Sequence, residues 1–200
     1  MTGENLGGGQ SVARYYIEKF IRQNKEYIKG AVLEIGDARY SMAEENEAIE
    51  DITILSLEDE EKEHYVKGNL ETGEGLNEET FDCIILTNVL SCLFDVQLAV
   101  SNVGRILKKG GSVIITVPGI GHLNRVDYES YGQYWRFTPM GLSRLLEKHI
   151  PGGKISITTY GNVKTSVAFL YGLCTEDLTQ EELDYRDDSY PLLIGICVEK

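Results

Sequence analysis

The sequence predicts an α/β fold, in which a mainly parallel sheet is covered by helices. Short apolar runs rich in β-branched residues alternate along the chain with longer segments whose apolar residues recur at helical spacing. The prolines support these boundaries, because all four fall at predicted element edges: Pro118, Pro139, Pro151 and Pro191. With 200 residues and neither an internal repeat nor a linker, the chain is expected to form one domain.

The first half of the chain predicts one helix and four strands. Residues 1–10, with three consecutive glycines, are expected to be a flexible lead-in, and the helical spacing of residues 11–29 ends at Gly30. The strands are predicted at 31–36, 51–57, 64–70 and 81–88. Residues 41–50 contain few apolar side chains, so the helix after the first strand is expected to be short.

The second half predicts further strands and helices in alternation. The strands are predicted at 111–119, 154–160 and 191–199, and the helices at 93–107, 139–150, 163–173 and 179–184. Thr138 and Pro139 favour a helix start, because threonine caps free N–H groups and proline suits the first turn. Residues 120–137 have no apolar period, and a loop of that length in a compact domain is usually functional.

The charge of the chain excludes several classes of protein. The net charge is −13, and residues 41–80 alone contain 14 Asp or Glu side chains but only two Lys. No dense run of Lys or Arg is present to bind nucleic-acid phosphates. No apolar run reaches the roughly 18 residues of a membrane span, and the first residues lack the apolar core of a secretory signal. We therefore expect a cytoplasmic protein that binds neither nucleic acid nor a membrane.

The cysteines and histidines predict no metal site. The cysteines form no C-x-x-C pair, and most lie in apolar runs, which predicts reduced, buried thiols at Cys83, Cys92, Cys174 and Cys197. The histidines are far apart in sequence, at His64, His122 and His149.

The turn after the first strand is the first candidate ligand site, because ligands of open parallel sheets bind beyond the carboxyl ends of the strands. Gly36 permits a sharp turn and a close backbone approach, and Glu34 can contact either a ligand ammonium group or its own loop. A dinucleotide site would require G-x-G-x-x-G, of which only the first glycine is present. The next strand ends carry Ser56, Glu58 and Asp59, then Asn69 and Leu70, then Thr87 and Asn88. Their hydroxyl, amide and acidic groups suit a cationic adenosine derivative.

Four segments, in this order, resemble class I S-adenosylmethionine-dependent methyltransferases: VLEIGDARY, GNLETG, FDCIILTNVL and RILKKGGSVIITVPG. The resemblance runs from about residue 14 to the C-terminus, so residues 11–200 are expected to form a single methyltransferase-like domain with substrate-side insertions at 120–137 and 171–190. It implies a Rossmann-like, doubly wound, seven-stranded sheet, mostly parallel with an antiparallel last strand and helices on both faces. The tail, with YGQYWRFTPMGLSRLL, is similar to a bacterial methyltransferase type 11-like group associated with surface-glycan and sugar biosynthesis.

The resemblance implies S-adenosylmethionine as the cofactor and assigns its contacts. Glu34, Gly36 and Asp37 would hold the amino-acid end, Ser56 or Glu58 the ribose, Asn69 and Leu70 the adenine, and Thr87 would lie near the sulfonium. The chain departs from the family pattern at Ala38 and Tyr40, which replace the second and third glycines of the loop, and at Ser56, where an acidic residue is common.

The expected reaction is methyl transfer to a small molecule, with O-methylation of a sugar or related metabolite as the leading hypothesis. An alcohol acceptor needs a base within hydrogen-bond reach, and residues 120–137 offer His122 and Asp127. The same segment offers side chains to hold the acceptor: Tyr131, Tyr134, Trp135 and Arg136.

Two alternatives stay open beside the enzyme hypothesis. The changed loop residues also fit a methyltransferase-fold domain that has lost catalysis and serves as a binding or scaffold module. The second alternative is a nicotinamide oxidoreductase, motivated only by the α/β pattern and by Tyr160 and Lys164, whose Y-x-x-x-K spacing matches short-chain dehydrogenases. No glycine-rich dinucleotide loop precedes this motif, so we interpret the spacing itself as chance. A homodimer is compatible with the sequence.

Overall fold

The computed structural model describes residues 8–42 and 46–200. One seven-stranded sheet runs through them in the order β3-β2-β1-β4-β5-β7-β6. Its strands are β1 (Gly30–Ile35), β2 (Ile49–Ser56), β3 (Tyr65–Lys67), β4 (Phe81–Thr87), β5 (Leu107–Pro118), β6 (Lys154–Tyr160) and β7 (Leu193–Glu199). Strand β7 is antiparallel to both of its neighbours, and every other pair is parallel. The predicted fold class is confirmed, including the antiparallel last strand.

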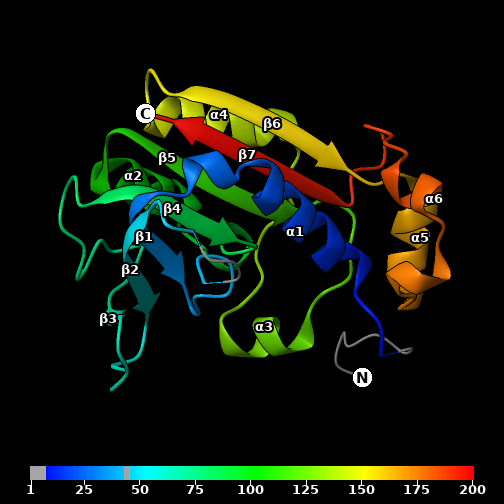
Figure 1. The fold of residues 1–200 in the computed structure, drawn as a ribbon, viewed down its shortest axis with the longest axis horizontal. Coiled ribbons are helices and arrows are strands. Elements are labelled where there is room, and N and C mark those ends of the chain that lie inside the picture. The colour runs from blue at the N-terminus through cyan, green and yellow to red at the C-terminus, as the bar shows by residue number, and fades with distance from the viewer. Residues whose placement is uncertain (1–7, 43–45) are drawn as a thin grey trace.

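Helices cover both faces of the sheet, as predicted. They are α1 (Val12–Gln23), α2 (Val96–Ile106), α3 (Arg125–Ser130), α4 (Pro139–His149), α5 (Val163–Tyr171) and α6 (Gln180–Asp184). Figure 1 shows α1 across the near face, α2 and α4 behind the sheet, and α5 and α6 together beside one end of it. Helix α3 lies apart from the others, below the ends of the central strands (Figure 1).

The core has two layers because side chains alternate along the central strands. Ile84 and Leu86 of β4 pack on the α2 and α4 side, whereas Cys83 and Ile85 pack on the α1 side with Phe20. Burial of both faces explains why β4 is an unbroken apolar run in the sequence.

The short helix predicted after the first strand is not found. None of the described residues between β1 and β4 is helical, and residues 43–45 of that predicted helix lie outside the described part. The acidic segments there lack an apolar stripe with which a helix could pack, and their described residues form turns, bends and irregular chain. In Figure 1 helix α1 does not lie over strands β2 and β3.

Several element boundaries differ from the predicted ones. The first helix ends at Gln23 and is followed by a 3-10 turn at Lys25–Tyr27, and the third strand has only the residues Tyr65–Lys67. Strand β5 begins earlier than predicted, because Leu107 pairs with Phe81. The segment 120–137, predicted as an irregular loop, contains α3, whose first turn is capped by Asn124.

Candidate functional site

The candidate site lies at the carboxyl ends of β1 and β4, where the strand order reverses. Strand β1 pairs with β2 on one side and with β4 on the other, and Glu34 lies beside Ile85. Thr87, at the end of β4, lies beside Thr116 of β5. Ligands of doubly wound sheets bind at this switch point, so these strand ends define the site.

The carboxylate of Glu34 is turned toward its own loop. The side chain is 1% exposed, and its oxygens accept hydrogen bonds from Tyr40 N (3.0 Å), Ser41 N (2.9 Å) and Ser41 Oγ (2.7 Å). Burial raises the pKa of Glu34, and the hydrogen bonds from Ser41 and Tyr40 oppose that rise. In the described structure Glu34 therefore organises residues 37–41.

Gly36 leaves open space at the start of this loop. Its φ is +82°, and a Cβ added there would meet no atom within 4 Å. Asp37 is exposed and forms an ion pair with Arg39 at 3.4 Å. Neither Ala38 nor Tyr40 has a positive φ, and Tyr40 packs against the core on the α1 side. The two replacements of glycine thus adopt ordinary backbone angles, because the loop follows a path that needs only Gly36.

Four predicted cofactor residues lie at or just after the ends of β2 and β3: Ser56, Glu58, Asn69 and Leu70. The Ser56 hydroxyl accepts a hydrogen bond from Glu58 N at 3.2 Å, while the Glu58 side chain is exposed. Asn69 Oδ1 accepts from Glu71 N at 2.7 Å and so closes a turn. Leu70 is 3% exposed and belongs to the core layer beneath α2.

The segment of residues 119–137, here called the acceptor-side segment, is fastened to the strand ends. Its first residue, Gly119, donates to Leu192 O at 2.9 Å. Near its other end Tyr134 N donates to Ser91 O at 2.8 Å, and Trp135 Nε1 donates to Leu93 O at 2.9 Å. The segment therefore lies over the chain that follows β4, beside the candidate site.

The two candidate bases have different surroundings. His122 is exposed, its ring stacks on Phe169 with centroids 5.0 Å apart, and its Nδ1 lies 2.9 Å from Leu123 O. Asp127 is half-buried, and burial raises its pKa. In the described residues no group donates a hydrogen bond to the Asp127 carboxylate. Burial is the main cause that raises the pKa of Cys92, and the negative charge of Asp127 adds to it, so Asp127 lies in the neighbourhood of Cys92, in the 3-10 turn that follows β4.

The structure brings together only some of the predicted acceptor-binding residues. Tyr134 and Trp135 lie around Phe94, with ring centroids 5.3 Å and 6.4 Å from it. Arg136 donates to His122 O at 2.9 Å and so ties the acceptor-side segment to itself. Tyr131 is 61% exposed.

Asn88 was expected at this edge of the sheet as one of the strand-end polar residues, but the sequence assigned it no specific contact to the cofactor. Asn88, directly after β4, has a φ of +59°, and its Oδ1 is buried without a hydrogen-bond partner among the described residues. The only signal in the sequence was an asparagine at a strand end, the non-glycine residue type that best tolerates positive φ. Whether its side chain is satisfied depends on neighbours that the sequence does not identify.

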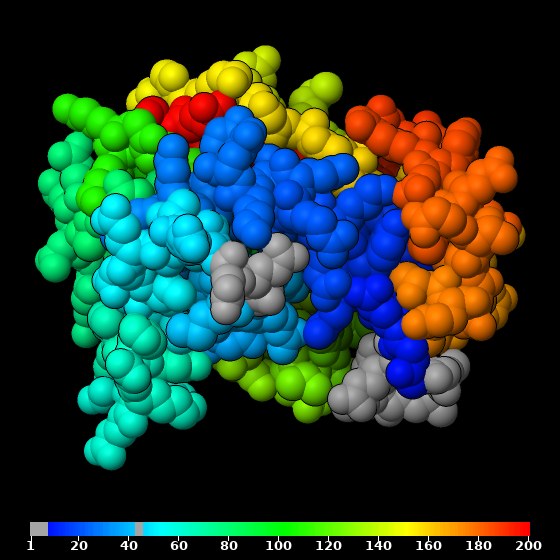
Figure 2. Space-filling view, viewed as in Figure 1, coloured from blue at the N-terminus to red at the C-terminus, as the bar shows by residue number. Residues whose placement is uncertain are grey.

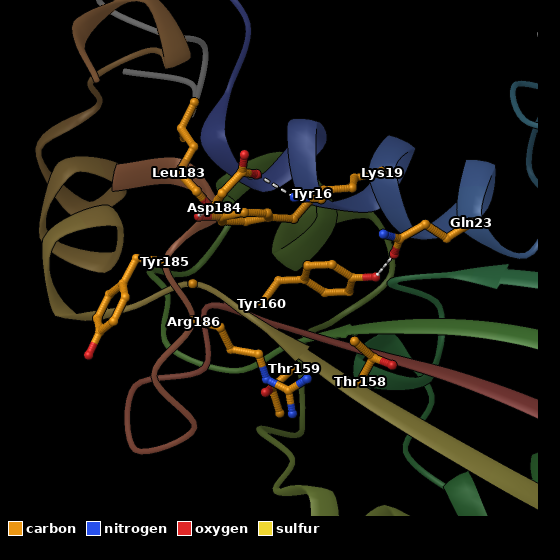
Figure 3. Close-up of a pocket in the computed structure, with 11 residues that line it drawn as sticks. Tyr16, Lys19, Gln23, Thr158, Thr159, Tyr160, Leu183, Asp184, Tyr185 and Arg186 are labelled. Carbon is orange, nitrogen blue, oxygen red and sulfur yellow. Dashed lines mark hydrogen bonds and ion pairs between the residues drawn. The ribbon is translucent and has the colours of Figure 1, made fainter. Parts of the chain in front are cut away.

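A separate cavity of about 210 Å³ lies between α1, β6 and α6. Figure 3 shows the Tyr160 hydroxyl directed at Gln23, to which it donates at 2.5 Å, and Lys19 directed at Asp184. No predicted cofactor or acceptor residue lines this cavity. Lys164 pairs with Glu182 instead of Tyr160, so the Y-x-x-x-K residues have separate partners.

The thiols and the acidic side chains form no metal centre in the described ranges, where no group of three or more His, Cys, Asp or Glu side chains could hold an ion. All four cysteines are free; Cys92 is half-buried and the other three are buried. No helix in residues 8–42 or 46–200 is long and apolar enough to cross a membrane.

Comparison with known proteins identifies a matching domain family and solved structures with a similar fold. Residues 37–115, less than half of the chain, match a methyltransferase domain family. No curated protein sequence matches the chain. An S-adenosylmethionine-dependent methyltransferase from Archaeoglobus fulgidus has a similar structure at 15% identity, with 94% of each chain covered and a TM-score of 0.62. A possible histamine N-methyltransferase from Thermotoga maritima is similar at 19% identity, covering 94% of this chain and 91% of its own, with a TM-score of 0.62.

The same fold also carries other chemistry. The [4+2]-cyclase SpnF is similar at 10% identity, covering 92% of this chain and 80% of its own, with a TM-score of 0.60. The chain therefore has the fold of S-adenosylmethionine-dependent methyltransferases, and the family match together with that fold indicates S-adenosylmethionine as the cofactor.

Proposed function

We propose that the chain is an S-adenosylmethionine-dependent methyltransferase that methylates an oxygen of a small molecule, a sugar or related metabolite. The observation that carries this proposal is the position of the family match. Residues 37–115 include the loop after β1 and the ends of β2, β3 and β4, which together form the ligand edge of the sheet. Fold alone would not support an activity, because one fold hosts many functions.

The residues at this edge fit the cofactor. Gly36 has open space on its side-chain face, where the backbone can approach a ligand closely. Gly36 and Asp37 would hold the amino-acid end, Ser56 and Glu58 the ribose hydroxyls, and Asn69 the adenine, with Thr87 near the sulfonium. The acidic segment between β2 and β3 favours a cation over a phosphate-rich ligand. When bound, the cofactor supplies a methyl group on a positively charged sulfur.

The acceptor-side segment supplies the remaining parts of the proposed reaction. Asp127 is the better candidate base, because its half-buried carboxylate has no hydrogen-bond donor among the described residues to give up before it accepts a proton from an acceptor hydroxyl. Tyr134 and Trp135 would form an aromatic wall for a sugar ring. Much of the rate of such a displacement comes from aligning the two reactants, which these side chains would do.

Calorimetry with S-adenosylmethionine and S-adenosylhomocysteine tests the proposal, with NADPH as the comparison ligand. We expect both adenosyl ligands to bind and NADPH not to bind. Release of S-adenosylhomocysteine is then measured across a panel of free sugars and hydroxy acids. Absence of adenosyl-ligand binding at millimolar concentration would overturn the proposal.

The scaffold alternative has a specific observation in its favour. Glu34, expected at the amino-acid end of the cofactor, is engaged by its own loop, and Ala38 and Tyr40 replace two loop glycines. A domain without catalysis would bind the cofactor weakly and release no S-adenosylhomocysteine with any acceptor. Bound cofactor together with methyl turnover excludes this alternative.

A further inference from the structure

Strand β4 ends in an unusual backbone conformation. In the described part of the chain, three residues other than glycine have a positive φ: His64, Glu79 and Asn88. His64 and Glu79 are exposed, whereas Asn88 is half-buried and follows the strand at the switch point of the sheet. Such conformations persist where the surroundings enforce them, and they are concentrated at ligand sites.

The backbone of Asn88 is satisfied, but its side chain is not. Asn88 N donates to Thr116 O at 2.8 Å, and Asn88 O accepts from Ser91 Oγ at 2.8 Å. Asn88 Oδ1 is buried without a hydrogen-bond partner in residues 8–42 and 46–200, and so is the hydroxyl of Thr116 on the adjacent strand. A buried amide oxygen that accepts no hydrogen bond is destabilising, so its occurrence at a ligand edge points to a donor that arrives with a ligand.

The position of Asn88 in the sheet indicates which part of the cofactor would supply this hydrogen-bond donor. The cofactor carries N–H or O–H groups on its amino-acid end, its ribose and its adenine. The ribose and the adenine are assigned to the ends of β2 and β3, which lie on the far side of β1 from β4 in the sheet. The amino-acid end is assigned to the turn after β1, which is the strand next to β4.

The acceptor expected for that amino-acid end is already occupied. Glu34 receives hydrogen bonds from Tyr40 N, Ser41 N and Ser41 Oγ, and it is almost fully buried. Resting on the proposed function, we propose that Asn88 replaces Glu34 in this role, with Asn88 Oδ1 accepting a hydrogen bond from the ammonium group of the cofactor's amino-acid end. Glu34 then acts through the loop that it holds in place.

The test compares two ligands that differ by the amino-acid end. S-adenosylhomocysteine has the ammonium group, and methylthioadenosine lacks it but keeps the ribose and the adenine. We expect Asn88→Gly to weaken S-adenosylhomocysteine about tenfold or more in calorimetry, the effect of losing a hydrogen bond to a charged group, and to leave methylthioadenosine unchanged. The melting midpoint should not fall, because glycine adopts a positive φ without steric strain.

Two further variants make the result specific. Glu79→Gly makes the same replacement at another positive φ, on an exposed turn before β4, and should leave both affinities unchanged. Asn88→Asp keeps a side-chain oxygen and tolerates the conformation, so it should retain S-adenosylhomocysteine binding.

The outcomes separate this inference from the proposed function. If the unmodified protein binds S-adenosylhomocysteine and Asn88→Gly binds it equally well, the inference is wrong and an ordered water satisfies Asn88. Equal losses for both ligands would also contradict it, because the contact would not be to the amino-acid end. If the unmodified protein binds neither ligand, the proposed function fails, and this inference fails with it.

Discussion

Glu34 and Asn88 lie at the ends of neighbouring strands, and their side chains are in opposite states. Glu34 is buried and accepts hydrogen bonds from three donors of its own loop, whereas Asn88 Oδ1 is buried and has none from the described residues. A carboxylate that is buried and hydrogen-bonded to its own loop helps to hold that loop in place. An unsatisfied group lowers stability and leaves hydrogen-bonding capacity for one. The unsatisfied residue is therefore the better guide to ligand contacts at this edge.

Gly36 tests the cofactor site at the level of a single residue. We expect Gly36→Val to weaken S-adenosylhomocysteine binding about tenfold or more, because a β-branched side chain would occupy the open space that the ligand needs. Gly152→Val is a matched control: Gly152 also has a φ of +82° and no atom within 4 Å of an added Cβ, but it lies in the turn before β6. Calorimetry and melting curves of both variants separate loss of binding from backbone strain. Unchanged affinity in Gly36→Val would refute the site assignment.

Asp127 gives the proposed reaction a defined pH dependence. A base acts in its deprotonated form, and burial raises the pKa of Asp127 above the usual aspartate range. Turnover should therefore fall as the pH drops through this raised pKa. Asp127→Asn should lower turnover roughly 100-fold or more and remove that acidic limb, while leaving cofactor affinity unchanged. The pH profile of S-adenosylhomocysteine release measures both effects, and a larger loss in His122→Asn would assign the base to His122 instead.

At the scale of elements, the structure joins α5 and α6 through one side chain. Asn162 caps α5 by accepting from Thr165 N at 3.0 Å, and its Nδ2 donates to Glu182 O (2.8 Å) and Tyr185 O (2.7 Å) around the end of α6. Leu183 of α6 in turn accepts the hydroxyl hydrogen bond of Tyr16. In Figure 2 the surface of α5 and α6 (orange) adjoins that of α1 (blue).

Removing this junction should be more costly than removing an ordinary cap. Asn162→Ala loses the cap and leaves two carbonyl groups without donors, so we expect the free energy of unfolding to fall by about 2–4 kcal/mol. Thr138→Ala removes only a cap, the 3.2 Å hydrogen bond from Gly141 N at the exposed start of α4, and should cost about 1 kcal/mol. Chemical denaturation measures both values. Equal losses would show that the contacts of Asn162 to α6 contribute nothing.

At the scale of the whole molecule, the excess of acidic side chains is expected to affect the affinity for S-adenosylmethionine more than the affinity for S-adenosylhomocysteine. S-adenosylmethionine carries one more positive charge than S-adenosylhomocysteine, and the protein carries a net charge of −13. We expect added salt to weaken S-adenosylmethionine binding more than S-adenosylhomocysteine binding, because screening shortens the reach of surface charge to about 10 Å at 0.1 M. Calorimetry of both ligands over a salt series measures the difference. Parallel salt dependences would show that the negative charge of the protein does not affect its affinity for the cofactor.

Much of this fold could be predicted from the sequence, because strands buried on both faces and capped helices leave local signals. The apolar run of β4, and the Thr138–Pro139 start of α4, were located to within a residue. The segment between the first two strands was less predictable. Its low apolar content predicted a short helix, but the described residues form turns. Glu34 stabilises the first of them by accepting hydrogen bonds from Tyr40 and Ser41.

The sequence by itself determined the α/β class, the acidic character and the strand ends from which ligand contacts must come, since these depend on composition, periodicity and local turn chemistry. Only the tertiary structure decided which of those side chains are free. Hydrogen-bond satisfaction depends on partners distant in the chain. Asn88 N donates to Thr116 O on the neighbouring strand, and Trp135 Nε1 donates to Leu93 O in the chain that follows β4. Burial and hydrogen-bond satisfaction arise only when the chain is packed. For that reason the sequence places Asn88 at the ligand edge, but only the three-dimensional structure singles it out by its unsatisfied Oδ1.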